Sequence, residues 1–315
     1  MDSPTLNYVS CKDAAGGHRM AFWQWGAADA PHLVECVHGL SRQGRDFDVL
    51  ARALVAAAPV RVVCPDVVGR GRSDWLADPM GYQPPTYVAD MLQMLAQLNA
   101  AAPVQVLDWV GTSMGGLIGM VIAGTPQLPL PAEIRRLVLN DVGPVIEWAA
   151  LQRIGAYLGK SGRFESVQQA ADAMWAVSQS FGPHTPAQWL ELSQAMVKPA
   201  PDGQGFVLHY DPAIAVPFGT MTEEGARQGQ AALWQLYDNI RAQALVLRGA
   251  QSDLLSRETA AAMSQRGPRA RVAEFEGVGH APTLIAGDQL QAVLGFLLAP
   301  EESQFPDEKP RSGAG

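Results

Sequence analysis

Short hydrophobic runs alternate with longer segments of helical period along most of the chain. Six runs rich in valine, leucine and isoleucine have the composition of strands buried on both faces: HLVECVHG, VRVVCPDVV, VQVLDWVG, RRLVLNDVG, QALVLRGA and RVAEFEGVG. Between the second and third, TYVADMLQMLAQL places its apolar residues on one helical stripe, with Thr86 expected as the N-cap. This alternation predicts an α/β fold of three layers, a mostly parallel sheet with helices on both faces.

One interval breaks the alternation. Residues 146–237 contain no run typical of a buried strand, but include helical segments such as RFESVQQAADAMWAV and PAQWLELSQAMV. We therefore predict a core formed by residues 1–145 and 238–300, with 146–237 inserted between two core strands as a helical cap. Residues 301–315 are polar and rich in proline, glycine and serine, so we predict a disordered tail.

Charge and cysteine content narrow the function classes. The net charge of −8 and the absence of a Lys/Arg cluster argue against nucleic-acid binding. Cys11, Cys36 and Cys64 have no paired spacing, which fits a reducing compartment. The N-terminus lacks the pattern of a signal peptide, and the uncharged run from Trp109 to Ala132 is interrupted by glycine and proline. We expect a soluble cytoplasmic protein without a membrane partner; a homo-oligomer stays open.

A serine between glycines follows the third strand-like run. In GTSMGG, residues 111–116, the G-x-S-x-G spacing suits a tight strand-to-helix turn that presents Ser113 beyond the end of a parallel strand. Gly111 and Gly115 remove side chains that would collide across this turn. The N–H of Met114, at a helix N-terminus, would face negative charge developing near Ser113. Ser113 is therefore our candidate nucleophile.

A base and an acid are available after later strands. His280 directly follows the last strand-like run, on the same face as Ser113, and suits a general base. For the acid we prefer Asp253, which follows the penultimate core strand and gives the chain order Ser, Asp, His. Asp141, after RRLVLN, is the alternative, as a supporting hydrogen-bond partner or loop cap. The other histidines lie in loop-like or polar stretches and are expected at the surface: His18, His32, His184 and His209.

An early loop could complete the site. Gly39 would let the backbone turn so that the Leu40 N–H faces Ser113 as a second oxyanion donor, with His38 organising the loop. Arg42 and Arg45 follow this loop and could meet a substrate carboxylate, although we favour solvated loop charges for both.

Taken together, these motifs resemble those of the α/β-hydrolase superfamily, in its esterase- and lactonase-like branch. The resemblance covers about residues 20–300 and lies in HG at 38–39, PDVVGRGRSD at 65–74, GTSMGG at 111–116, GAQSD at 249–253 and GVGHAP at 277–282. It implies Ser113 as nucleophile, His280 as base, Asp253 as acid, and the N–H groups of Leu40 and Met114 as the oxyanion hole. The insertion corresponds to the family's cap.

The same resemblance limits the chemistry. Haloalkane dehalogenases and epoxide hydrolases of this fold have aspartate where this chain has Ser113. The longer HGGG oxyanion loop, a His-Glu-x-x-His site and a Walker-A loop are absent from the sequence, so we expect no cofactor and no metal. We predict hydrolysis of a small carboxylic ester, lactone or thioester by water through an acyl-enzyme. Two alternatives stay open: a C–C bond hydrolase of ring-fission diketones with the same triad, and a small-ligand receptor with a vestigial triad.

Overall fold

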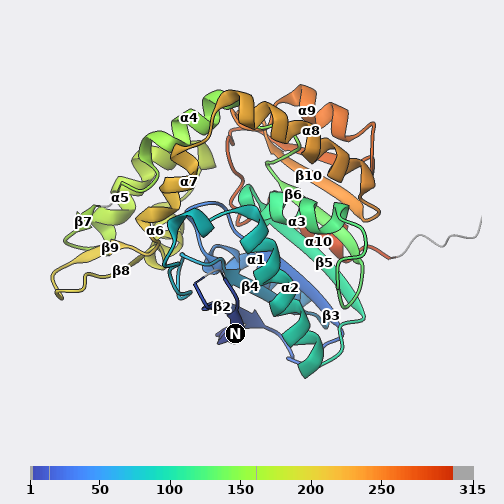
Figure 1. Ribbon diagram of the computed structural model, residues 1–315, viewed down its shortest axis with the longest axis horizontal. Helices are drawn as coiled ribbons and strands as arrows, with labels where there is room; N and C mark the ends of the chain where they lie inside the picture. The colour runs from blue at the N-terminus through green and yellow to red at the C-terminus, as the bar shows by residue number, and fades with distance from the viewer. Residues whose placement is uncertain (1–2, 14, 161, 301–315) are drawn as a thin grey trace, which may run out of the picture.

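An eight-stranded sheet forms the centre of the molecule. The computed structural model describes residues 3–13, 15–160 and 162–300, and the order of the strands is β1-β2-β4-β3-β5-β6-β10-β11 (Figure 1). Every pairing from β4 to β11 is parallel. These six strands are the six predicted runs: β3 (His32–Val37), β4 (Arg61–Asp66), β5 (Val106–Thr112), β6 (Ile134–Asn140), β10 (Gln243–Gly249) and β11 (Arg271–Phe275). The predicted α/β class with a mostly parallel sheet is confirmed.

The first two strands were not predicted. β1 (Thr5–Cys11) and β2 (His18–Trp25) form an antiparallel hairpin, and β2 also pairs antiparallel with β4. β1 is an edge strand and is largely exposed. Its mixed polar and apolar composition therefore lacks the buried-strand pattern that identified the other six.

Helices cover both faces of the sheet. α1 (Asp48–Ala57) and α10 (Gly287–Leu297) pack on one face, and α2 (Pro84–Ala101), α3 (Met114–Gly124), α8 (Glu223–Asn239) and α9 (Arg257–Met263) pack on the other. α2 begins earlier than expected. Its N-cap is Gln83 rather than Thr86, because prolines occupy the first helical positions, where a missing N–H costs nothing.

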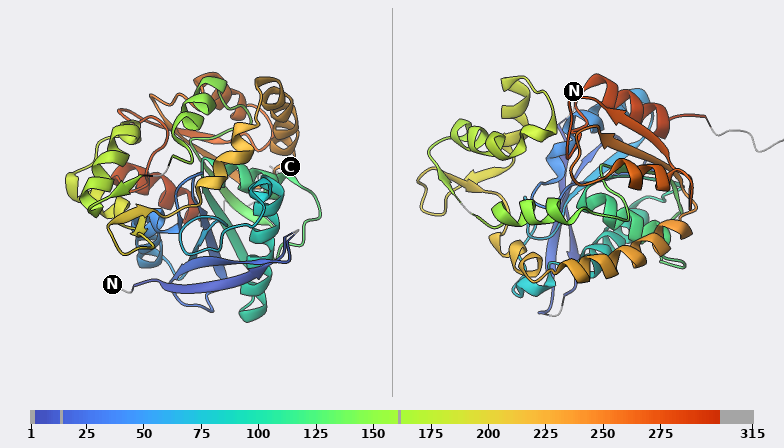
Figure 2. Two further views of the ribbon diagram at one scale, coloured as in Figure 1. Left: turned by 60° about the vertical axis from the view of Figure 1, so that its left-hand side comes forward. Right: turned by 90° about the horizontal axis from the view of Figure 1, so that it is seen from above.

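The smaller elements of the predicted cap gather at one end of the molecule (Figures 1 and 2). They are α4 (Trp148–Tyr157), α5 (Val167–Ser178), α6 (Pro186–Gln194), α7 (Ala215–Gly219) and a three-stranded sheet of β7 (Arg163–Phe164), β8 (Val197–Pro199) and β9 (Phe206–Leu208). Short 3₁₀ turns complete the described structure: η1 (Gly44–Phe47), η2 (Pro79–Gly81), η3 (Gln179–Phe181) and η4 (Pro212–Ile214).

Helix α8 bears on the proposed boundary between core and cap. Although all but its last two residues lie within 146–237, it packs against α3, and a Cβ on Gly124 of α3 would lie 2.1 Å from the carbonyl oxygen of Leu236. We therefore propose that the cap ends before α8, near Thr222. The predicted tail, 301–315, lies outside the described residues. Within the described ranges no helix is both long enough and apolar enough to cross a membrane.

Candidate active site

Ser113 occupies a strained turn between β5 and α3. Its φ of 51° and ψ of −116° are rare for a residue with a side chain. A Cβ on Gly111 would lie 2.3 Å from the Gly115 carbonyl oxygen, and one on Gly115 would lie 1.9 Å from the Val37 carbonyl oxygen. Both positions therefore require glycine, and the turn holds the serine hydroxyl beyond the end of β5.

A chain of hydrogen bonds joins three side chains at this edge of the sheet. His280 Nε2 lies 3.0 Å from Ser113 Oγ, and His280 Nδ1 lies 2.7 Å from Asp141 Oδ2. Asp141 directly follows β6, which is paired with β5, so its carboxylate lies beside the serine turn. The imidazole is therefore placed between a hydroxyl and a carboxylate, the arrangement that activates a serine nucleophile.

Further donors fix the carboxylate of Asp141. Its Oδ1 accepts the N–H of Gly249 at 2.9 Å, and its Oδ2 accepts the hydroxyl of Ser252 at 2.6 Å. Asp141 is fully buried, and its own N–H donates to Leu247 at 2.7 Å. These contacts come from β10 and the loop after it. Because Asp141 itself follows β6, strands β6 and β10 together orient the carboxylate toward His280.

The expected partnership of Asp253 with His280 is wrong. Asp253 is about half exposed and accepts two hydrogen bonds from Arg153 of α4, at 2.6 and 2.9 Å. The loop after β10 turns tightly, with the Ser252 N–H bonded to the Gly249 carbonyl at 2.9 Å. As a result Ser252 points inward to Asp141, while Asp253 points outward to the predicted cap.

Asn140 is a supporting residue that the sequence analysis missed. Its side-chain nitrogen Nδ2 donates to Thr112 Oγ1 at 2.9 Å and to the Pro282 carbonyl at 2.8 Å, and its main-chain carbonyl accepts the Ser113 N–H at 3.0 Å. The residue therefore connects the serine turn with the loop that carries His280. Its position directly before Asp141, at the end of a strand neighbouring the serine strand, was the available signal.

The loop at 38–40 lies against Ser113. His38 is fully buried, its Nδ1 is bonded to the Gly39 carbonyl at 2.7 Å, and its Nε2 accepts the Val67 N–H at 2.9 Å. Burial lowers the pKa of His38 to about 3, so the imidazole is neutral and supports the backbone of this loop. Arg70 adds a hydrogen bond of 2.8 Å to the Leu40 carbonyl.

Two N–H groups near the serine are available to a ligand. Those of Leu40 and Met114 have no hydrogen-bond partner among the described residues. Met114 is the first residue of α3, where the helix dipole favours negative charge. Gly39 approaches the serine closely, since a Cβ there would lie 3.6 Å from Ser113 Cβ.

A cavity of about 260 Å³ opens onto Ser113 and His280. Core residues Gly39, Leu40 and Thr112 form part of its wall, and the predicted cap supplies Arg153, Lys160 and a set of apolar residues: Ile154, Met174, Val177, Phe181, Met196 and Leu208. An apolar cavity with a few polar groups at one end is typical of a small-molecule site.

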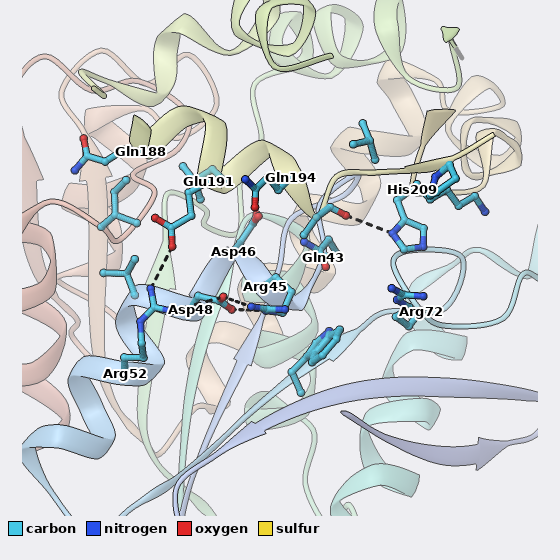
Figure 3. A pocket seen from close by; sticks show the side chains of 18 residues that line it. Gln43, Arg45, Asp46, Asp48, Arg52, Arg72, Gln188, Glu191, Gln194 and His209 are labelled. Atoms are coloured by element: carbon cyan, nitrogen blue, oxygen red, sulfur yellow. Dashed lines mark hydrogen bonds and ion pairs between the residues drawn. The ribbon is translucent and has the colours of Figure 1, made fainter. Parts of the chain in front are cut away.

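A larger groove of about 580 Å³ lies between α1 and α6 and does not include the serine (Figure 3). Several of its charged side chains pair with one another: Arg45 with Asp48 on the same wall, and Arg52 of α1 with Glu191 of α6 across the groove. Arg45 also lies over the ring of Trp23, 4.8 Å from its centroid. Arg42 lines the smaller cavity instead and is held by Asp46 through two bonds of 2.6 Å. Both predicted loop arginines are therefore ion-paired.

The other histidines lie away from the serine. His18 is buried rather than at the surface, with its two ring nitrogens each 2.9 Å from a carboxylate, those of Asp13 and Asp90. Cys11, His18 and Asp90 have ligand-type atoms within 4.8 Å of one another, so this cluster is where the described residues could hold a metal ion. His18 is hydrogen-bonded to both Asp13 and Asp90, and Oδ1 of Asp90 has no hydrogen-bond partner among the described residues. His209 lines the groove, and burial lowers its pKa to about 4.

Comparisons with known proteins identify a family and several related hydrolases. A family model described as the alpha/beta hydrolase family matches residues 36–293. A 3-hydroxybutyrate-oligomer hydrolase from Cupriavidus necator is 50% identical over 290 residues, which cover 91% of this chain and 96% of that protein. The crystal structure of an alpha/beta hydrolase from Novosphingobium aromaticivorans superposes with a TM-score of 0.81 at 34% identity, covering 95% of this chain and 99% of that one.

A further solved structure shares the fold alone. E-2-(acetamidomethylene)succinate hydrolase superposes with a TM-score of 0.74 at 21% identity, covering 94% of this chain and all of that one (100%). The family match spans most of the sequence and includes the serine turn, the strand ends and the His280 loop. The chain therefore belongs to the alpha/beta hydrolase family, as its motifs predict.

Proposed function

We propose that the protein hydrolyses short carboxylic esters, with Ser113 as nucleophile, His280 as base and Asp141 as the acid that orients it. The observation that carries this proposal is the hydrogen-bonded series Ser113–His280–Asp141 at the wall of an apolar cavity. Asp141 takes the role that the sequence analysis gave to Asp253.

The reaction follows from the contacts of each group. Ser113 Oγ attacks the ester carbonyl while His280 Nε2 takes its proton, and Asp141 stabilises the resulting imidazolium. The N–H groups of Leu40 and Met114 bind the tetrahedral oxyanion. His280 then protonates the departing alcohol, and a water molecule, deprotonated by His280, releases the acid from Ser113.

The substrate we propose is a short oligomer of 3-hydroxybutyrate. The relative from Cupriavidus necator is named for that substrate and is 50% identical over 290 residues. The cavity of about 260 Å³ is smaller than the roughly 300–1,000 Å³ usual for ligand pockets, which favours dimers and trimers. Its apolar wall suits the methyl groups of such a chain.

The test is steady-state hydrolysis by the wild type and Ser113→Ala. The substrates are the 3-hydroxybutyrate dimer and p-nitrophenyl esters from acetate to laurate. We expect the variant to lose about 10³- to 10⁶-fold in kcat. Ser264→Ala, at an exposed serine after α9, is the matched control and should keep full activity.

The same assay separates the remaining alternatives. Turnover of a ring-fission diketone with negligible ester hydrolysis would replace the proposal by a C–C hydrolase. If wild type and Ser113→Ala are equally inactive and a ligand raises Tm, the proposal is replaced by that of a small-ligand receptor.

A further inference from the structure

All strongly charged side chains lining the catalytic cavity are cationic. They are Arg42, Arg153 and Lys160, and no aspartate or glutamate lines the cavity among the described residues. The chain as a whole has a net charge of −8, so this local excess of positive charge runs against its composition. Cations gathered in a cleft attract an anionic substrate.

Two of these cations are already neutralised by carboxylates. Arg42 makes two hydrogen bonds of 2.6 Å to Asp46, and Arg153 makes two, of 2.6 and 2.9 Å, to Asp253. In both pairs the arginine fork is satisfied by the planar carboxylate opposite it. Neither guanidinium therefore brings a full uncompensated charge to the cavity.

Lys160 differs from both arginines. It follows α4, where its own N–H donates to the Tyr157 carbonyl at 3.1 Å, and its side chain is exposed at the cavity. Its ammonium group has no hydrogen-bond or ion-pair partner within the described part of the chain. One uncompensated positive charge therefore remains at this site.

We propose that the Lys160 ammonium, with the paired Arg153 beside it on the same wall, binds the free carboxylate of the substrate. This subsite rests on the proposed ester hydrolysis at Ser113. A 3-hydroxybutyrate oligomer has one carboxylate, at one end, and one unpaired cation matches that single charge. Anchoring this end fixes which ester bond reaches Ser113, so the enzyme removes units from the carboxyl end and does not cut at random.

The test compares two dimers that differ only in their terminal group, which is charged in one and neutral in the other. One is the 3-hydroxybutyrate dimer with its free carboxylate, and the other has a terminal carboxamide in its place. The measured quantity is the ratio of their kcat/KM values, acid over amide. We expect Lys160→Gln to lower this ratio about tenfold, mainly through the KM of the acid, and Lys160→Arg to restore most of it.

A matched control uses another lysine of the same region. Lys198→Gln removes a cation that lies over the ring of Trp75, 4.5 Å from its centroid, and lines the larger groove instead. This variant should leave the ratio within twofold of wild type. A ratio that is unchanged in Lys160→Gln, or that falls equally in Lys198→Gln, would overturn the proposal.

A binding measurement separates this subsite from the proposed reaction. Failure of the wild type to hydrolyse either dimer contradicts the ester hydrolysis. Calorimetric binding of 3-hydroxybutyrate to Ser113→Ala, with and without Lys160→Gln, then tests the subsite alone. Affinity lowered about tenfold by the second substitution supports the carboxylate site, and equal affinity rejects it.

Discussion

His280 and His18 each hold a carboxylate at one ring nitrogen and differ in the group at the other. His280 lies between Asp141, at 2.7 Å, and the hydroxyl of Ser113, at 3.0 Å. His18 lies between two carboxylates, those of Asp13 and Asp90, each at 2.9 Å. His280 opens onto a cavity, whereas His18 is enclosed by the β1–β2 hairpin and α2.

The second partner decides what each imidazole can do. Burial pulls the pKa of His18 down, but hydrogen bonds and charge from Asp90 and Asp13 outweigh it, so the pKa is raised. An imidazolium held by two carboxylates has no position free to accept a proton and acts as a structural ion pair. His280, facing a hydroxyl, can take the proton of Ser113. A histidine–aspartate contact alone therefore does not identify a catalytic base.

We expect the greatest loss of activity when the carboxylate beside His280 is removed. Asp141→Asn should lower kcat/KM for p-nitrophenyl acetate about 10³- to 10⁴-fold, because an amide no longer stabilises the imidazolium or fixes its tautomer. Asp253→Asn is the matched control, since it removes a carboxylate from the neighbouring loop. It should cost less than about tenfold, and a larger loss in that variant would return Asp253 to the catalytic role.

Removing a carboxylate partner of His18 should lower the stability of the fold and leave the rate of the reaction unchanged. Asp90→Asn leaves the buried His18 with one carboxylate, and we expect the free energy of unfolding to fall by about 3 kcal/mol. Urea unfolding measures this loss, and kcat of the folded variant should stay near wild type. Asp13→Asn, at the more accessible partner, should cost less. Loss of kcat without loss of stability in Asp90→Asn would contradict the structural assignment.

Glu35 shows what a buried carboxyl group costs when no histidine is paired with it. Glu35 in β3 is fully buried, neither of its oxygens has a partner among the described residues, and burial raises its pKa well above the usual range. Glu35→Met should raise the free energy of unfolding by about 1–2 kcal/mol, because the unpaired polar group is removed at similar volume. Destabilisation by this variant would show that Glu35 has a partner in solution.

The smallest effect is a pH dependence of stability from the His18 cluster. The folded pKa of His18 is raised, so its contribution is fully present below the unfolded value of about 6.5 and is lost as pH rises through the folded pKa. The stability difference between wild type and His18→Gln should therefore shrink as the pH rises above about 6.5, measured by urea unfolding. A difference that grows with pH would contradict the raised pKa.

The local sequence pattern was sufficient to predict much of the fold and the tight turn at Ser113. The six buried strands follow from composition, and the turn at Ser113 follows from glycines whose spacing acts within a few residues. The partner of His280 depends instead on which strand lies beside β5 and which way two loops turn. Ser252 and Asp253 are neighbours in sequence, yet one faces Asp141 and the other faces Arg153.

Long-range packing also decides where a helix belongs. The amphipathic pattern of α8 is the same whether it covers the sheet or an inserted cap, so the sequence could not show that it packs on α3. The Cys11–His18–Asp90 cluster was missed for a related reason. Asp90 lies 72 positions from His18 and reaches it only because α2 packs against the first hairpin.

The three residues of the proposed triad are widely spaced along the chain, and this spacing affects refolding. His280 is 167 positions from Ser113 and 139 from Asp141, and β3, β5, β6 and β10 must be in register before the three meet. Contacts between residues so distant in sequence form late, since closing long loops costs entropy before any contact repays it. Helix content can therefore return well before ester hydrolysis does, and recovery of activity marks the completion of the sheet.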